Sequence, residues 1–79
     1  MNNNEKYLQV FAEALGIAES EAQGLNYQGI QAWDSVGHMA LISALEEAFD
    51  IMMDTDDIID FSSFEKGKEI LAENYEIEF

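Results

Sequence analysis

The segment from Ser35 to Phe49 carries the clearest folding signal in the chain. At about 100° per residue, its large apolar side chains fall on one side of a helix, which would be the face turned toward a core. This face consists of Leu41, Ile42, Leu45 and Phe49, with Ala44 and Ala48 beside it. Asp34 precedes the segment as a suitable N-cap, and Asp50 would mark its end. The pattern therefore predicts one main helix here.

The N-terminal part predicts another helix and a long connection. Glu5–Leu15 has helical apolar spacing, the asparagines before it can cap it, and Gly16 can end it. The connection from Ile17 to Trp33 holds many large apolar residues, so we expect it to pack onto the domain. The sequence AESEA inside it could form a single helical turn.

The C-terminal part predicts two further helices. A short one is capped by Asp54 or Thr55, and a longer one runs from a cap at Ser62 or Ser63 to about Tyr75. No segment is predicted to be a strand. We therefore expect residues 1–79 to form one all-α domain, a small bundle of three main helices and one short helix with a long loop after the first helix.

The chain is strongly acidic. It contains 17 carboxylates against three lysines and no arginine, and its net charge is −14. A basic stripe that could neutralise phosphates is missing, so we do not expect nucleic-acid binding, and an acidic surface also repels anionic lipid. Two interpretations of the charge stay open, because it can keep a small protein soluble or attract partner proteins with basic patches.

Composition also limits the location of the protein. Hydrophobic residues make up 48% of the chain, which argues against an acidic disordered tail. No apolar run approaches the roughly 18 residues of a membrane span, and the first residues lack the pattern of a signal peptide. Without cysteine there is neither a disulfide nor a thiolate metal site. We therefore expect a cytoplasmic protein with no membrane partner. We also expect a monomer.

The start of the main helix departs from a simple amphipathic pattern. Val36 and Met39 fall on the outer face, together with Glu46 and Glu47. They could be exposed by chance, or they could form an apolar docking stripe bordered by acids. Ser35 also has two interpretations. It is an ordinary residue near a helix cap, or it holds a phosphoryl group, because helix N-termini favour anions.

The sequence DSVGHMALISALEEAFDI resembles the Asp-Ser-Leu attachment site and following helix of acyl carrier proteins. In that family the serine bears 4′-phosphopantetheine, which a magnesium-dependent phosphopantetheinyl transferase moves from coenzyme A. Asp34 matches the family aspartate, Ser35 matches the modified serine, and Val36 stands where leucine is usual. The sequence DDIIDFSSFEKGKEIL resembles the family's short third helix and the start of its fourth, so the resemblance covers nearly the whole chain.

The resemblance implies a non-catalytic carrier and no enzyme. Acyl groups would travel as thioesters on the thiol of the arm, and helices of the family's bundles can shelter them. Synthetases or acyltransferases with basic patches would load the arm. The residues that would meet these partners are Val36, Met39, Glu46 and Glu47. Because GHMA stands where carriers of primary fatty-acid synthesis usually have acidic residues, we expect a specialised or accessory carrier.

Other functions compete with this one. A peptidyl or aminoacyl carrier of nonribosomal synthesis shares the serine site, and an acidic interaction module also stays open. Asp34, Ser35 and His38 suggest a hydrolase triad, but neighbours at one helix start cannot readily place the base between hydroxyl and acid. A calcium loop over Asp54–Glu65 has isoleucines where a ligand and a glycine are needed. We therefore expect no catalytic site and no specific metal site.

Overall fold

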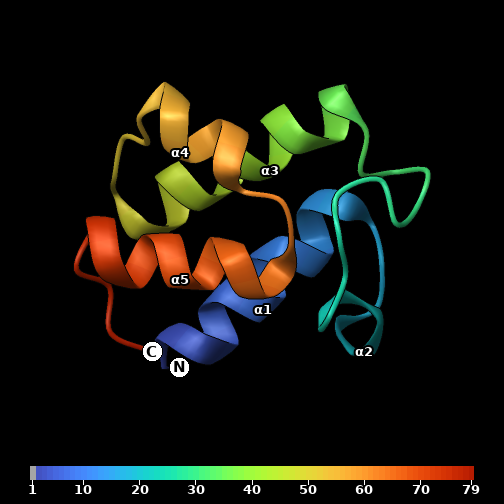
Figure 1. The fold of residues 1–79 in the computed structure, drawn as a ribbon. Helices are drawn as coiled ribbons and strands as arrows, with labels where there is room; N and C mark the ends of the chain where they lie inside the picture. Colours follow the sequence, from blue (N-terminus) through green and yellow to red (C-terminus); the bar gives the residue numbers. More distant parts are fainter. Residues whose placement is uncertain (1) are drawn as a thin grey trace.

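The computed structural model describes residues 2–79, which form five helices and no strand longer than an isolated bridge. The helices are α1 (Asn3–Leu15), α2 (Glu19–Ala22), α3 (Ser35–Phe49), α4 (Thr55–Asp60) and α5 (Phe64–Asn74). In Figure 1, α3 and α4 lie above α5, α1 crosses behind α5, and α2 lies at the side. Helix α1 packs against α3 and α2, and α4 packs against α5. The predicted small all-α fold is confirmed.

Polar residues set the helix ends largely where the sequence predicts them. The side chain of Asn2 accepts a first-turn N–H at 2.8 Å and caps α1. Gly16 ends α1 with a φ of 68°, a conformation that glycine adopts at little cost. The cap of α5 is Ser63 and not Ser62, because the Ser63 hydroxyl accepts the N–H of Lys66 at 2.9 Å.

Aromatic rings fill the centre of the bundle. Phe11 of α1 meets Trp33 and Phe64 edge-on, with ring centroids 5.1 Å and 5.0 Å apart. Tyr7 is buried and donates its hydroxyl to the Phe64 carbonyl at 2.7 Å, and burial raises the pKa of this phenol far above its ordinary value. The predicted core face of α3 is buried against these rings through Leu41, Ile42 and Leu45.

The C-terminal residues close one end of the core. Phe49, which the periodicity places on the core face, is only half-buried, and its ring centroid lies 6.4 Å from that of Phe79. Phe79 also meets Tyr7 edge-on at 5.6 Å. The Asn3 side chain donates to the Glu78 carbonyl at 2.9 Å, so the two ends of the chain lie side by side (Figure 1).

The long connection between α1 and α3 packs onto the bundle, as its apolar residues predict. Trp33 is fully buried, and α2 is the single helical turn expected from AESEA. The N–H of Tyr27 donates to the Ser62 carbonyl at 2.8 Å, and the Leu25 carbonyl accepts from the first residue of α5 at 2.8 Å. These bonds tie the connection to the link between α4 and α5, and they bring Tyr27 to the start of α3.

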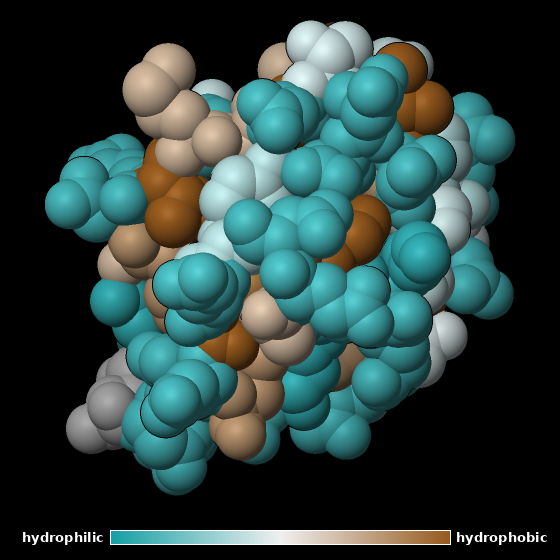
Figure 2. Space-filling model, turned by 60° about the vertical axis from the view of Figure 1, so that its left-hand side comes forward, coloured by the Kyte–Doolittle hydropathy of each residue, from teal (hydrophilic) through white to brown (hydrophobic). Residues whose placement is uncertain are grey.

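The surface is mainly hydrophilic on the face shown in Figure 2, with hydrophobic side chains scattered among the polar ones. Among the described residues 2–79, large hydrophobic side chains are nevertheless exposed at five positions, which are Val36, Met39, Met52, Ile59 and Phe79. Met39 and Ile59 line the same groove as Ser35, and Val36 is its neighbour in the chain. Among residues 2–79, no helix is long and apolar enough to cross a membrane.

Candidate functional site

Ser35 is exposed at the N-terminal end of α3. The carboxylate of Asp34 accepts the N–H of Gly37 at 2.8 Å, which confirms Asp34 as the N-cap. The hydroxyl of Ser35 is therefore not used for capping, and it lies 3.3 Å from the hydroxyl of Tyr27. A helix N-terminus carries the positive end of the helix dipole, so an anion attached to this oxygen would be in a favourable field.

Gly37 allows the first turn of α3 to approach the preceding connection. A Cβ atom at this position would collide with the carbonyl oxygen of Ala32. Any larger residue here would push the connection away from the helix start. The structure thus gives a steric reason for a glycine at position 37.

An apolar groove opens beside Ser35, between α3, α4 and the connection. Its volume is about 350 Å³, toward the lower end of the range of small-molecule pockets, about 300–1,000 Å³. The groove is lined by Tyr27, Ser35, His38, Met39, Ile58, Ile59, Phe61 and Ser62. Most of these side chains are apolar, so the groove suits an apolar ligand next to the Ser35 hydroxyl.

His38 fixes one wall of this groove. Its Nδ1 accepts the indole N–H of Trp33 at 2.9 Å, and its Nε2 lies 2.8 Å from the Ile58 carbonyl. An indole N–H can only donate and a carbonyl can only accept, so the proton of the imidazole must be on Nε2. Because both nitrogens are engaged, His38 has a structural role and does not provide a base for Ser35.

The N-terminal part of α4 is held by the C-terminal end of α5. The Tyr75 hydroxyl donates to Asp57 at 2.7 Å and accepts the N–H of Asp54 at 2.8 Å, while Asn74 donates to Asp57 at 2.9 Å. Burial and the bond to Asp57 raise the pKa of the Tyr75 phenol. Residues 55–60 form α4, so this acidic segment has no twelve-residue calcium loop, and residues 2–79 contain no His, Asp and Glu cluster suited to a metal.

The four predicted docking residues are placed differently from one another. Val36 and Met39 are 79% and 52% exposed, as the helical wheel predicts, and Glu47 is also exposed. Glu46 is half-buried, and its carboxylate accepts the N–H of Met53 at 2.8 Å. Glu46 therefore stabilises the turn after α3. Both glutamates lie about 17 Å along the helix from Ser35, so only Val36 and Met39 adjoin it.

Sequence analysis did not identify Tyr27 or Phe61 as site residues. Tyr27 lies in an irregular connection, and Phe61 lies in the link between α4 and α5. Neither segment has a periodicity that shows which way a side chain points. The available signal was the number of large apolar residues in the connection, which indicates packing but not a position beside Ser35.

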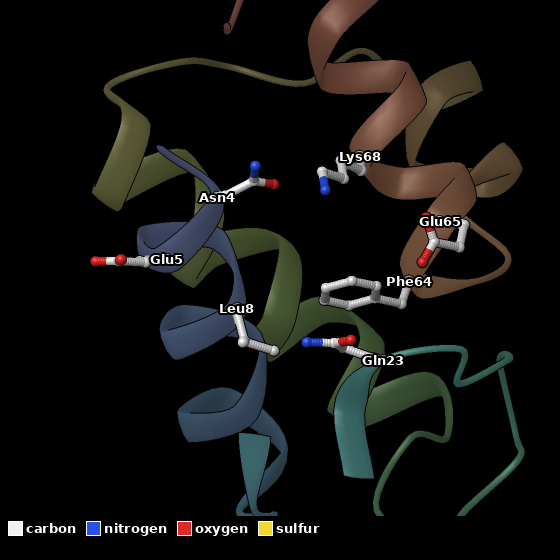
Figure 3. A pocket seen from close by; sticks show the side chains of 7 residues that line it. All are labelled: Asn4, Glu5, Leu8, Gln23, Phe64, Glu65 and Lys68. Atoms are coloured by element: carbon white, nitrogen blue, oxygen red, sulfur yellow. The ribbon is translucent and has the colours of Figure 1, made fainter. Parts of the chain in front are cut away.

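A second and smaller pocket lies between α1, α5 and the residue after α2 (Figure 3). Its volume is about 280 Å³, and its lining is Asn4, Glu5, Leu8, Gln23, Phe64, Glu65 and Lys68. Leu8 and Phe64 lie between Asn4 and Lys68 on one side and Gln23 on the other, and Glu5 points away (Figure 3). The Lys68 amine lies 5.5 Å from the Phe79 ring centroid. This pocket offers no hydroxyl to which a group could be attached, so the groove at Ser35 is the stronger candidate.

Replacing His38 with leucine should destabilise the fold by about 1–3 kcal/mol, because the Trp33 N–H and the Ile58 carbonyl lose their partner. The free energy of unfolding in urea measures this. Met39→Leu, one position along the helix on an exposed site, is the matched control and should stay within about 0.5 kcal/mol of the unmodified chain. An unchanged free energy of unfolding for His38→Leu would show that the two hydrogen bonds of His38 do not stabilise the fold.

Comparison with known proteins assigns neither a family nor a function to the chain. No known family's sequence profile, no curated protein and no solved structure matches this chain. The interpretation of the site therefore depends on its own geometry and on the residues that form it.

Proposed function

We propose that the chain is an acyl carrier protein that bears 4′-phosphopantetheine on Ser35. The observation that carries this proposal is an exposed hydroxyl at a helix N-terminus directly beside an apolar groove of about 350 Å³. The hydroxyl offers an attachment point, and the groove offers shelter to an apolar acyl group. The acyl-carrier-like sequence around Ser35 and the helix order, with a long connection before α3 and a short α4, support the same function.

The dipole of α3 favours a phosphate at the start of this helix, although the net charge of the chain disfavours one. The dipole of α3 stabilises a nearby anion by about 0.3–1 kcal/mol. The carboxylate of Asp34 and the net charge of −14 act in the opposite direction. A covalent bond removes this difficulty, since the site then needs only to tolerate the phosphate and not to capture it from solution. Attachment at Ser35 is therefore compatible with an acidic protein, whereas free phosphate binding there is not favoured.

In the attachment step, the Ser35 oxygen forms a bond to the pantetheine-bearing phosphorus of coenzyme A. The pyrophosphate bond breaks, adenosine 3′,5′-bisphosphate leaves, and the hydroxyl proton passes to a base. His38 cannot be that base because both of its nitrogens are occupied, so the transferase must supply it. When bound, the group supplies a thiol on a flexible arm, and this thiol carries acyl groups as thioesters.

Partner enzymes would contact the carrier next to the attachment point of the arm at Ser35. Val36 and Met39 provide exposed apolar contact beside Ser35, and small interfaces obtain most of their energy from such central contacts. The acidic surface, including Glu47, would accelerate encounter with basic partners in a salt-dependent way. Glu46 is better explained by its bond to Met53 than by docking. The arrangement suits contacts that form quickly and release readily.

An aminoacyl or peptidyl carrier is the second candidate, because it would use the same serine. The groove beside Ser35 favours acyl cargo, since aliphatic and aromatic side chains dominate its lining. A charged aminoacyl group would gain little from these walls and would lose hydration on entering. At GHMA the chain departs from carriers of primary fatty-acid synthesis, and this departure leads us to propose a dedicated loading enzyme and not the primary fatty-acid pathway.

Incubation of the chain with coenzyme A, magnesium and a phosphopantetheinyl transferase should add one phosphopantetheine group, and Ser35→Ala should add none. Intact mass spectrometry measures the adduct. Ser62→Ala, which removes another hydroxyl of the same groove, is the matched control and should still be modified fully. An adduct that persists in Ser35→Ala would assign the attachment to another serine.

Val36→Glu and Met39→Glu should leave the domain folded, with stability changes within about 0.5 kcal/mol. Each should lower kcat/KM for attachment of the arm by about tenfold or more, as expected when a central interface contact is lost. Leu45→Glu, at a fully buried position of the same helix, should unfold the domain. Melting temperature and transferase kinetics separate these effects. A Val36→Glu variant that unfolds, or that is loaded at the original rate, would show that this face is not a docking surface.

A further inference from the structure

We propose that Tyr27 is a positioning residue of the attachment site. Its hydroxyl lies 3.3 Å from the Ser35 hydroxyl, which it would orient before modification. After modification it would donate a hydrogen bond to the phosphate of the arm. This inference rests on the proposed function of Ser35 and assigns a role to a residue of the long connection that the sequence pattern did not single out.

The phenol of Tyr27 is held firmly in place. Its backbone N–H donates to the Ser62 carbonyl at 2.8 Å. Its ring meets Trp33 and His38 edge-on, with centroids 5.9 Å and 5.2 Å apart. Trp33 is fully buried and His38 is hydrogen-bonded through both nitrogens, so the two rings that support the phenol are themselves fixed. A group supported in this way can orient another group with little freedom to move.

The backbone after Tyr27 is also constrained. Gln28 has a φ of 65°, which is uncommon for a residue with a side chain. Its N–H donates to the Trp33 carbonyl at 3.0 Å, so the connection folds back on itself at this point. The surrounding structure therefore holds the backbone next to Tyr27 in one uncommon conformation.

The distribution of charge makes a phenol the fitting donor. No lysine or arginine occurs between residues 7 and 65, so the connection, α3 and α4 contain no such side chain to meet a phosphate. His38 is already occupied. A tyrosine hydroxyl can donate, and a hydrogen bond to an ionised acceptor is roughly twice as strong as one between neutral groups. Tyr27 would thus supplement the helix dipole at a site without cationic side chains.

Tyr27→Phe tests this role because it keeps the ring and removes only the hydroxyl. We expect kcat for attachment to fall about fivefold, the effect of losing one ordinary hydrogen bond, with KM unchanged because Val36 and Met39 are intact. In the modified protein, the phosphorus NMR resonance of the arm should shift between Tyr27→Phe and the original chain. Tyr75→Phe is the matched control, since its hydroxyl binds Asp57 and neither residue lines the groove.

Several results would overturn the inference. One is an unchanged kcat together with an unchanged phosphorus resonance in Tyr27→Phe. Another is an equal shift in Tyr75→Phe, because the resonance would then report a loosened α4. If Tyr27→Phe fails to fold, nuclear Overhauser contacts between the Tyr27 ring and the arm in the unmutated protein decide the question, and their absence counts against it. No adduct on the unmutated chain would instead refute the proposed function itself.

Discussion

The two hydrogen bonds of His38 hold the candidate site together. One joins its imidazole to the indole of Trp33 in the long connection, and the other joins it to the Ile58 carbonyl in α4. Because Trp33 is buried in the core and Ile58 lines the groove, one side chain of α3 connects the core, the connection and the groove wall. Ser35 lies one turn away on the same helix, so its position relative to the groove depends on this residue.

The distribution of charge bears on the proposed attachment of an anionic arm to an acidic domain. The three lysines lie in α1 and α5, where the amine of Lys6 lies 4.8 Å from the Phe49 ring centroid and that of Lys68 lies 5.5 Å from Phe79. The connection, α3 and α4 contain no lysine or arginine. A phosphate there is best kept by a covalent bond, and basic groups are best supplied by partners, which agrees with weak, electrostatically guided encounters.

Local signals in the sequence predict the elements, and contacts between distant residues determine the site. The periodicity of residues 35–49 and the cap at Asp34 depend on neighbouring residues, and both predictions are confirmed. The helical wheel places Glu46 on the outer face, but it does not show that its carboxylate reaches the Met53 N–H. The groove and the Tyr27 contact depend on the path of an irregular connection, which no periodicity describes.

The central claim is that the Ser35 hydroxyl and the apolar groove form one site. It is tested most directly by comparing amide and methyl NMR spectra of the unmodified chain with those of the chain carrying a saturated acyl thioester on its arm. We expect shift changes in the first turn of α3 and in Ile58–Ser62, with nuclear Overhauser contacts between the acyl methylenes and the methyls of Ile58 and Ile59. Changes confined to the first turn of α3, with the acyl chain in solvent, would contradict the claim.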